Sequence, residues 1–339
     1  MNDVSRPAPV GVLIGFLISA VFLWYAFRGV NFSAMAGGIA RVGVVWVMAS
    51  ILVALTSLVL RGFRWRYLLG EERKIGFWSL VSATFIGVMA NNLLPARLGE
   101  VVRAWVLAQR EQTSTSGVLA SVVVERLVDV VTALLLLALS FVVAPTLDNG
   151  VAGLLGWSGL AVLVTFVGLA MGLLVVVQHR DRIMTAWDRW ARNANRSWAL
   201  HSAEQGRRFL EGLCVSQTKM QWVTMILLSF LVWGTSIVSF YMMGKGFSLD
   251  LTLAQMTLVW GIVLFGVAIP SAPGFVGTFH GFCVAGLALV AGTDPTLAAA
   301  YATLLHGSHW LAINGVGLAC LLSDRSVTWA GIAGLARQG

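Results

Sequence analysis

Charged residues are scarce in this chain of 339 residues, since Asp, Glu, Lys and Arg make up 11% of it, against roughly a quarter in soluble domains. Hydrophobic residues make up 58%, and the mean hydropathy is +0.83. Apolar runs long enough to cross about 30 Å of hydrocarbon recur along the chain. The scarcity of charge therefore excludes a soluble globular domain and predicts a single integral membrane domain over residues 1–339.

Cysteine is also scarce, and the three cysteines show no paired spacing: Cys214, Cys283 and Cys320. This excludes a disulfide framework and a cysteine zinc site. The sequence lacks a Walker-type glycine loop, a Gly-x-Ser-x-Gly elbow, a dinucleotide fingerprint and a His-Glu-x-x-His motif. We therefore assign no catalytic residue, no cofactor and no metal.

The few charges are unevenly distributed, with a net charge of +8. Basic residues cluster in segments 61–74 and 178–220, which the positive-inside rule places in the cytoplasm. We interpret the excess as a determinant of membrane orientation and not as a nucleic-acid site. The second segment also carries Trp187, Trp190 and Trp198, which suits an amphipathic segment lying on anionic lipid. The alternative is that both segments only determine orientation.

The chain contains a weak internal repeat whose copies lie roughly 174–179 residues apart. Gly87-Val88 precedes Pro95-Ala-Arg-Leu-Gly99, and Gly266-Val267 precedes Pro273-Gly-Phe-Val-Gly277. Two further matches keep the same order: Tyr67-Leu-Leu-Gly70 with Tyr241-Met-Met-Gly244, and Leu119-Ala120 with Leu297-Ala298. Four matches in one order at a nearly constant offset indicate a duplicated unit.

The predicted architecture is all-α, with about six full transmembrane helices and two opposed re-entrant hairpins of broken helices, at 77–109 and 253–290. The predicted segments are a first helix at 10–28, a first repeat half at 43–143, a linking helix at 151–177, the basic cytoplasmic loop at 178–220 and a second repeat half at 221–322. If the N-terminus is cytoplasmic, three crossings separate the start of the first half from the start of the second. The two halves then have opposite orientations in the membrane, and the C-terminus is also cytoplasmic. Inverted repeats with discontinuous helices are typical of transporters. The alternative is that both broken segments cross fully and the matches are accidental.

Hydrocarbon makes charge costly, yet six ionisable residues lie in or beside the first hairpin: Arg97, Glu100, Arg103, Glu125, Arg126 and Asp129. Glu125 and Asp129 are four residues apart and share a helix face, where they repel unless a cation or a proton lies between them. An arginine of the hairpin is the candidate cation. Because arginine suits phosphate, Arg97 and Arg103 predict a lipid-headgroup site. The alternative is that the ion pairs hold two helices in register.

Both hairpins contain residues that interrupt a helix, and we expect these to be hinges: Pro95, Gly99, Pro273, Gly274 and Gly277. Uncharged polar residues near the breaks are expected to contact the headgroup: Asn91, Asn92, Ser271 and Thr278. Three histidines lie in apolar spans: His280, His306 and His309. They predict a role in handling protons or the headgroup, and the alternative is a hydrogen-bonded structural role.

Three motifs resemble those of a known family: Asn92-x-x-Pro-x-Arg-x-Gly-Glu-x-x-Arg103, Glu125-Arg126-x-x-Asp129 and Pro270-x-x-Pro-Gly-x-x-Gly277. Together they resemble the flippase-like membrane domain of lysylphosphatidylglycerol synthases, over about residues 10–322. In two-domain members of that family, this region is associated with moving aminoacylated phosphatidylglycerol across the bilayer. Aminoacyl transfer belongs to a separate soluble domain, which we expect this chain to lack, so the resemblance does not imply synthase activity.

The sequence departs from the family pattern at two places. His280 follows the Pro-Gly-x-x-Gly motif where the family has Glu, and His306 lies in the last span, where the family has Arg. This double change indicates a substrate other than the lysyl lipid. Relatives are linked to polyprenyl-phosphate sugar pathways and to hopanoid or glycolipid export, and these add candidate lipids.

We therefore expect a flippase or lipid transporter of the bacterial cytoplasmic (inner) membrane, acting on an amphipathic, anionic or phosphate-bearing lipid. Arg97 and Arg103 would draw the headgroup, and Glu100, Glu125 and Asp129 would balance their charge. Three alternatives stay open: an intramembrane enzyme acting on a lipid phosphate with His306 as base or nucleophile, a secondary transporter of a small solute, and a non-transporting partner of a lipid-modifying enzyme such as a membrane glycosyltransferase.

Overall fold

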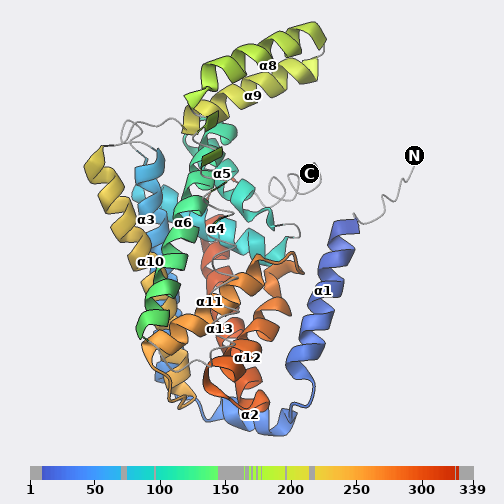
Figure 1. Ribbon diagram of the computed structural model, residues 1–339, viewed down its shortest axis with the longest axis vertical. Helices are drawn as coiled ribbons and strands as arrows, with labels where there is room; N and C mark the ends of the chain where they lie inside the picture. The colour runs from blue at the N-terminus through green and yellow to red at the C-terminus, as the bar shows by residue number, and fades with distance from the viewer. Residues whose placement is uncertain are drawn as a thin grey trace.

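The computed structural model describes most of the chain: residues 10–69, 75–94, 97–143, 178–194, 197–213, 218–324 and 326–327, with scattered positions between 164 and 176. Over these residues the secondary structure is helical and contains no strand, in agreement with the all-α prediction (Figure 1). The predicted linking helix at 151–177 lies largely outside the described residues, as do the proposed hinge Pro95 and Cys214.

Three segments of the described chain are long and apolar enough to cross a membrane. They are α3 (Val44–Leu69), α10 (Lys219–Gly246) and Pro273–Ala291, which comprises the short 3-10 helix η2 (Pro273–Phe275) and α12 (Thr278–Ala291). The chain is therefore a helical protein that crosses the membrane more than once.

α1 (Val10–Phe27) coincides with the predicted first helix, and it is followed by a helix that the sequence patterns did not predict. This second helix, α2 (Phe32–Ala40), lies at 83° to α1. Gly29 allows the bend because its φ of +74° lies in the left-handed region that favours glycine. The Asn31 side chain then caps α2 by accepting a 3.0 Å hydrogen bond from the Ala34 amide.

α3 and α10 pack against each other, and serine hydroxyls fix their register. Ser50 Oγ donates to the Ser239 carbonyl and Ser239 Oγ donates to the Ser50 carbonyl, both at 2.8 Å. Ser57 Oγ donates to the Val232 carbonyl, also at 2.8 Å. As the residue number rises along α3, that of the partner falls along α10, so the two helices are antiparallel.

The first predicted hairpin consists of α4 (Phe77–Leu93) and α5 (Gly99–Arg110), which pack against each other. Two glycines close the crossing, because a Cβ at Gly87 or Gly99 would overlap the backbone of the opposite helix. Asn91 Oδ1 accepts a 2.7 Å hydrogen bond from the Gly99 amide and so caps the start of α5. With 17 and 12 residues, the helices are shorter than the roughly 20 residues of a full span.

The second predicted hairpin consists of α11 (Leu253–Ala268), η2 and α12. Gly274 and Gly277 have φ values of +70° and +97°, so a side chain at either position would be strained. α1 packs beside this break, where Ser19 Oγ accepts a 2.8 Å hydrogen bond from the Ala272 amide. α11 has 16 residues and α12 has 14, so the second hairpin resembles the first in size.

The breaks of the two hairpins lie against each other. Arg97, in the first break, donates hydrogen bonds to the carbonyl of Val267 and, at 2.9 Å, to that of Ile269, where α11 ends. Its guanidinium lies 5.1 Å from the ring centroid of Phe275 in η2. A cation at the C-terminal end of a helix complements its exposed carbonyls. Arg97 therefore joins the two hairpins.

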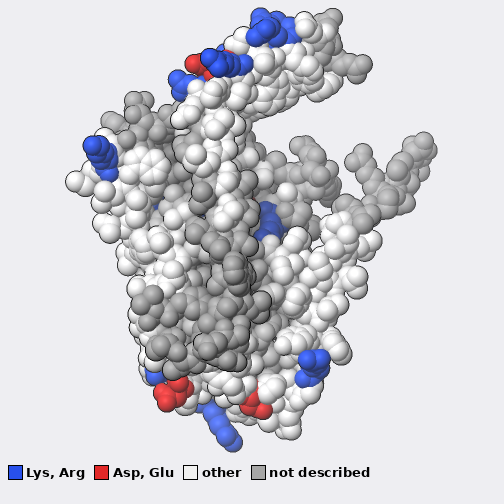
Figure 2. Space-filling model, in the orientation of Figure 1, with Lys and Arg blue, Asp and Glu red and all other residues white. Residues whose placement is uncertain are grey.

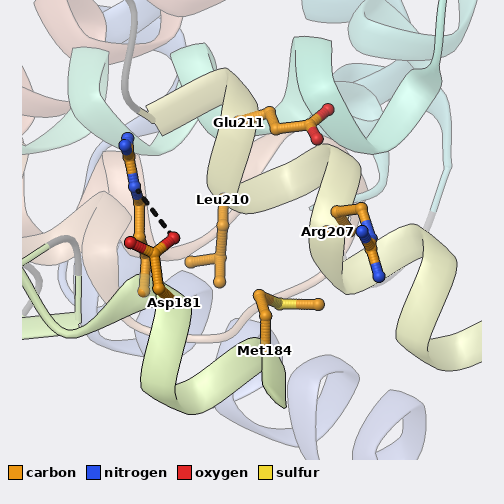
Figure 3. A pocket seen from close by; sticks show the side chains of 6 residues that line it. Asp181, Met184, Arg207, Leu210 and Glu211 are labelled. Atoms are coloured by element: carbon orange, nitrogen blue, oxygen red, sulfur yellow. Dashed lines mark ion pairs between the residues drawn. The ribbon is translucent and has the colours of Figure 1, made fainter. Parts of the chain in front are cut away.

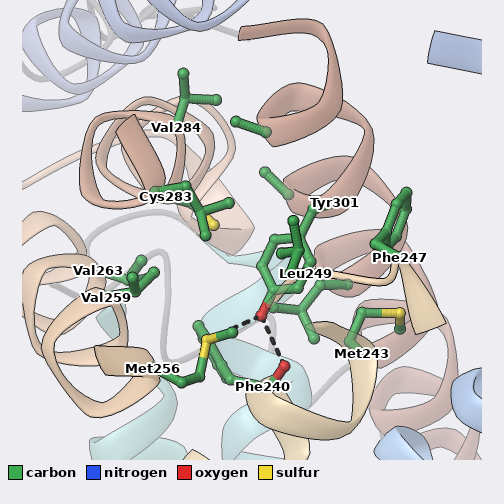
Figure 4. Close-up of a cluster of buried hydrophobic side chains, with 14 of the residues drawn as sticks. Phe240, Met243, Phe247, Leu249, Met256, Val259, Val263, Cys283, Val284 and Tyr301 are labelled. Carbon is green, nitrogen blue, oxygen red and sulfur yellow. Dashed lines mark hydrogen bonds between the residues drawn. The ribbon is translucent and has the colours of Figure 1, made fainter. Parts of the chain in front are cut away.

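The last helix of each predicted half packs on both hairpins. α6 (Thr115–Val143) contacts α5 of its own half and α11 of the other, and α13 (Pro295–Leu322) contacts α12 and α4. In the second half, the Tyr301 hydroxyl donates a 2.8 Å hydrogen bond to the Phe240 carbonyl within a buried apolar cluster (Figure 4). The exchanged contacts interlock the two halves.

The predicted basic loop at 178–220 contains two helices, α8 (Arg180–Ala194) and α9 (Ser197–Leu213), which we call the arm. The arm extends beyond the end of the helical body (Figure 1). Figure 2 shows basic side chains along the arm, whereas the described side chains of the body are mostly uncharged on this face. The predicted amphipathic segment is thus a pair of helices outside the apolar body.

Two tryptophans and a hollow distinguish the arm. The Trp190 and Trp198 rings meet edge to face, 5.5 Å apart, and both are exposed. A hollow of about 310 Å³ lies between α8 and α9, with Asp181, Met184 and Arg207 along it (Figure 3). Arg207 also pairs with Asp188 at 2.6 Å, so an ion pair crosses from one helix of the arm to the other.

Candidate functional site: a buried charge network

Seven charged side chains from three helices meet inside the helical body, and we call them the charge network. They are Arg61 and Arg64 of α3, Glu100 and Arg103 of α5, and Glu125, Arg126 and Asp129 of α6. The side chains of Arg64 and Glu125 are 0% exposed. Because buried charges are costly unless they are paired, the geometry of each pair matters.

Glu125 is the centre of the charge network. Its carboxylate accepts hydrogen bonds from Arg61 Nε and Arg64 Nη2, both at 2.9 Å, and from Arg103 Nη2. Arg126 Nη2 lies 3.6 Å from the same carboxylate. Four guanidinium groups therefore surround one carboxylate.

Asp129 is paired from a different side. Arg64 Nη1 lies 2.7 Å from Asp129 Oδ1, and the Trp233 indole donates to the same oxygen at 3.2 Å. The nearest cation between Glu125 and Asp129 is thus Arg64 of α3, and Arg126 of α6 also contacts both, at 3.6 Å and 3.4 Å. The prediction that a hairpin arginine bridges them is wrong, because Arg103 approaches Glu125 from α5 and the bridging position is already filled from α3.

Arg103 is held in place by more than Glu125. Its guanidinium lies 3.9 Å from the ring centroid of Trp65, and the Trp65 indole donates to Ser121 Oγ at 2.9 Å. The side chain of Arg103 is only 2% exposed. Arg103 therefore positions Glu125 and offers little free surface to a ligand.

Glu100 and Arg126 form the open edge of the charge network, with side chains 30% and 36% exposed. Arg126 Nη2 lies 3.4 Å and Arg61 Nη2 3.6 Å from Glu100 Oε1. With all seven groups ionised, four guanidiniums face three carboxylates, so the network carries an excess charge of +1.

Arg61 and Arg64 were missed as site residues, because the basic segment 61–74 was predicted to be a cytoplasmic loop. The structure places both inside α3, with Arg64 buried, whereas Arg66 on the same helix is exposed. The signal that could have found them is their spacing. They are three residues apart, on one face, at the end of the apolar span predicted at 43–69.

Arg97 lies outside the charge network, in contact with α11 and η2 as described above, and is exposed. Asn91 caps α5, and Asn92 Nδ2 donates a 3.3 Å hydrogen bond to Asn314 Oδ1 of α13. The structure thus separates the predicted residues of the first hairpin into a buried group around Glu125 and a group at the junction of the hairpins.

The predicted polar residues of the second hairpin surround its break. Thr278 Oγ1 donates to Ser271 Oγ at 3.2 Å. His306 Nε2 donates to the Gly274 carbonyl at 2.9 Å, and the rings of His280 and His306 lie 4.9 Å apart. These residues form a second polar group, without a carboxylate among the described side chains that contact it.

His309 does not join the other two histidines. It faces α3 and α10, where its Nε2 lies 2.9 Å from Ser50 Oγ and 3.1 Å from Ser239 Oγ. Both hydroxyl protons are already directed to backbone carbonyls. His309 Nε2 therefore carries a proton and donates it to the two serines.

A cavity of about 170 Å³ lies between α3, α10 and α13, next to the charge network. Arg61 and His309 both line it, and Trp233, which binds Asp129, forms part of its wall. The cavity thus lies between the half-buried guanidinium of Arg61 and His309 of α13.

These features define a helical, multi-pass membrane protein with a charge network buried among its helices. The comparison with known families identifies it further. The chain belongs to the lysylphosphatidylglycerol synthase transmembrane-region family, whose profile matches residues 12–317. The resemblance inferred from the three motifs is thereby confirmed.

Relatives among curated proteins come from archaea. A UPF0104 membrane protein of Pyrococcus horikoshii is 24% identical over 294 residues, covering 78% of this chain and 82% of its own. One of Methanothermobacter thermautotrophicus is 23% identical over 299 residues, covering 82% and 85%. The glycosyltransferase AglD of Haloferax volcanii is 38% identical over 89 residues, which cover 25% of this chain and 14% of the glycosyltransferase. No solved structure matches the chain.

Proposed function

We propose that this protein moves an anionic, phosphate-bearing lipid between the leaflets of a membrane. The family description names a phospholipid synthase and supports a lipid-related role. The observation that carries the proposal is the charge network with its excess charge of +1. A positive charge inside an apolar body is stabilised by an anion, and arginine is well suited to bind phosphate.

The arrangement of the helices supports an inverted repeat with two re-entrant hairpins and about six full spans. α3 and α10, the first helices of the two halves, are antiparallel, as inversion requires. Each hairpin consists of two helices that are separated by a break and have between 12 and 17 residues each, and Arg97 joins the two breaks. Discontinuous helices that meet inside the bilayer are a recurrent form of transport site.

In the proposed mechanism, the exposed Arg97 at the hairpin junction attracts the headgroup, and the charge network holds its negative charge. Arg103 acts as a positioning residue that fixes Glu125. The glycine-containing breaks, which include Gly99 and Gly277, are the hinges at which one half moves against the other. His280 and His306 meet the headgroup on the side of the second break, while the acyl chains stay in lipid.

The arm supports an orientation with its basic residues in the cytoplasm and its tryptophans at the lipid surface. Trp190 and Trp198 are exposed beside several arginines, a combination that suits an anionic leaflet. We accordingly propose a bacterial inner-membrane location with both termini in the cytoplasm. A lipid-modifying enzyme is the proposed partner, and the similarity to part of a glycosyltransferase supports this.

Reconstitution tests the proposed function. The purified protein in liposomes should move fluorescent phosphatidylglycerol between leaflets faster than it moves an uncharged glycolipid. Protein-free liposomes provide the baseline. Movement no faster than this baseline for every lipid would contradict translocation, and chemical change of a lipid in detergent, where no leaflets exist, would favour an intramembrane enzyme. Gradient-driven uptake of a water-soluble substrate would favour a solute transporter.

A further inference from the structure

We propose that the cavity between α3, α10 and α13 binds the phosphodiester group of the lipid, between Arg61 and Ser236. This inference rests on the proposed function and deepens it by naming the chemical class of the substrate. Three properties of the cavity carry it: the hydrogen-bond donors left free, the position of the cavity between the two halves, and the charge of its surroundings.

Most polar groups along the cavity are already engaged. The hydroxyls of Ser57 and Ser239 donate to backbone carbonyls, and the Trp233 indole donates to Asp129. His309 donates to two serines, as argued above. A ligand must therefore bind to the donors that remain.

Two donors at the cavity are free among the described residues. Arg61 uses Nε for Glu125 and Nη2 for Glu100, which leaves Nη1 without a protein acceptor. Ser236 Oγ accepts a 3.2 Å hydrogen bond from the Trp260 indole, and its own proton has no acceptor. No described carboxylate lines the cavity. Free donors in a cavity that no described carboxylate lines favour an anion.

The position of the two donors supports a shared site. Ser57 and Val232 face each other across the antiparallel pair of α3 and α10 at a sequence offset of 175 residues. Arg61 and Ser236 differ by the same 175 residues, which falls within the offset of the internal repeat. Because the helices are antiparallel, the two residues lie on opposite sides of the Ser57–Val232 contact along the helix axes, and all four line the cavity. Arg61 and Ser236 are therefore corresponding residues of the two halves, and a ligand between them lies where the halves meet. Transport sites lie at such repeat interfaces.

The charge around the cavity favours a phosphodiester over a phosphomonoester. The charge network next to the cavity carries an excess of +1. A phosphodiester has a single negative charge and would neutralise this excess. A phosphomonoester carries about −1.5 to −2 at pH 7 and would leave a negative charge buried in the apolar body. The cavity should therefore prefer a diester.

The size of the cavity fits a headgroup and not a whole lipid. Its volume of about 170 Å³ equals roughly six water molecules at about 30 Å³ each. Sites for larger molecules usually have about 300–1,000 Å³. The phosphate and its ester oxygens can enter, while the acyl chains must stay outside.

Binding measurements in an uncharged detergent at pH 7.5 and fixed ionic strength test this site. The probes are dihexanoyl-phosphatidylglycerol, a diester, dihexanoyl-phosphatidic acid, a monoester, and uncharged dihexanoylglycerol. We expect the diester to bind at least about tenfold more tightly than either of the others. Arg61→Gln should weaken diester binding by about tenfold or more. Arg189→Gln removes the same charge from the exposed arm and should leave binding unchanged.

A second variant keeps the test decisive if Arg61→Gln does not fold. Ala54 lines the cavity and carries no charge, so Ala54→Leu fills it without altering the charge network. It should weaken diester binding while Leu52→Phe, on an exposed part of the same helix, does not. Equal affinity for the diester and dihexanoylglycerol, or full diester binding by Ala54→Leu, would overturn the proposal. Dimethyl phosphate binding as tightly as the lipid would assign the site to a free phosphodiester and overturn the lipid assignment.

The two proposals fail separately. Diester binding through this cavity by a protein that leaves lipids in their original leaflet would contradict translocation and keep the site. Translocation by a protein that binds the diester and dihexanoylglycerol equally would keep translocation and overturn the site.

Discussion

Arg64→Gln removes the cation that lies nearest to both carboxylates of α6. Arg64 lies 2.9 Å from Glu125 and 2.7 Å from Asp129, with its side chain 0% exposed. Breaking a buried pair by removing one partner costs about 3–5 kcal/mol, and here Asp129 loses its nearest cation and keeps only Arg126, at 3.4 Å. At about 2–4 °C per kcal/mol, a ratio found for somewhat smaller domains, the melting temperature in detergent should fall by roughly 10 °C.

The matched control is Arg66→Gln, which removes an exposed arginine of the same helix and should change the unfolding free energy by no more than about 0.5 kcal/mol. Asp129→Asn combined with Arg64→Gln removes both a cation and an anion. The double variant should lose at least about 1 kcal/mol less than the two single losses together. The measurement is thermal unfolding, detected by size-exclusion chromatography, of the wild type, the single variants Arg64→Gln, Asp129→Asn and Arg66→Gln, and the double variant. Equal melting temperatures for Arg64→Gln and Arg66→Gln would refute the bridging role of Arg64. So would a loss of stability in the double variant equal to the sum of the losses in Arg64→Gln and Asp129→Asn.

Two further predictions concern the first hairpin and the C-terminal end of α13. Gly99→Ala places a methyl group against the backbone of α4 and should lower the melting temperature. The control Gly37→Ala places its methyl group in open space within α2 and should be neutral or slightly stabilising. Thermal unfolding of the two variants measures the difference. Burial alone would raise the pKa of Asp324, but hydrogen bonds from Ser326 and the Arg110 guanidinium 2.6 Å away hold it below its ordinary value of 3.8. The stability from this pair is therefore present above the ordinary pKa and is lost as the pH falls through the lowered one. The wild type should be more stable than Asp324→Asn at pH 7, and the difference should shrink below about pH 4; a difference independent of pH would contradict the assignment.

The positions of most helices could be predicted from the sequence, because apolar runs and helix-breaking residues determine helix boundaries through neighbours in the sequence. The break between α4 and α5 follows from the segment Pro95–Gly99, and that between α11 and α12 follows from Gly274 and Gly277. α2 was not readable in this way. It depends on the bend at Gly29 and the side-chain cap at Asn31, which follow a helix that looks like a complete span.

The charge network was only partly readable. The spacing of Glu125 and Asp129 predicted a cation between them, but it could not identify Arg64, which precedes Glu125 by 61 residues in the sequence. Charge counting assigned Arg61 and Arg64 to a cytoplasmic loop, because a sequence rule for orientation does not see acids on a distant helix. Long-range ion pairs become visible only once the packing of α3 against α6 is known.

Translocation of phosphatidylglycerol in liposomes by Arg61→Gln, compared with Arg189→Gln, tests the central claim most directly. Both variants lose one positive charge, but only Arg61 belongs to the charge network and lines the cavity. The rate of exchange between leaflets, normalised to the amount of folded protein, should fall at least about tenfold for Arg61→Gln and stay at the wild-type value for Arg189→Gln. Equal rates for the two variants would contradict a role of the buried arginines in moving an anionic lipid.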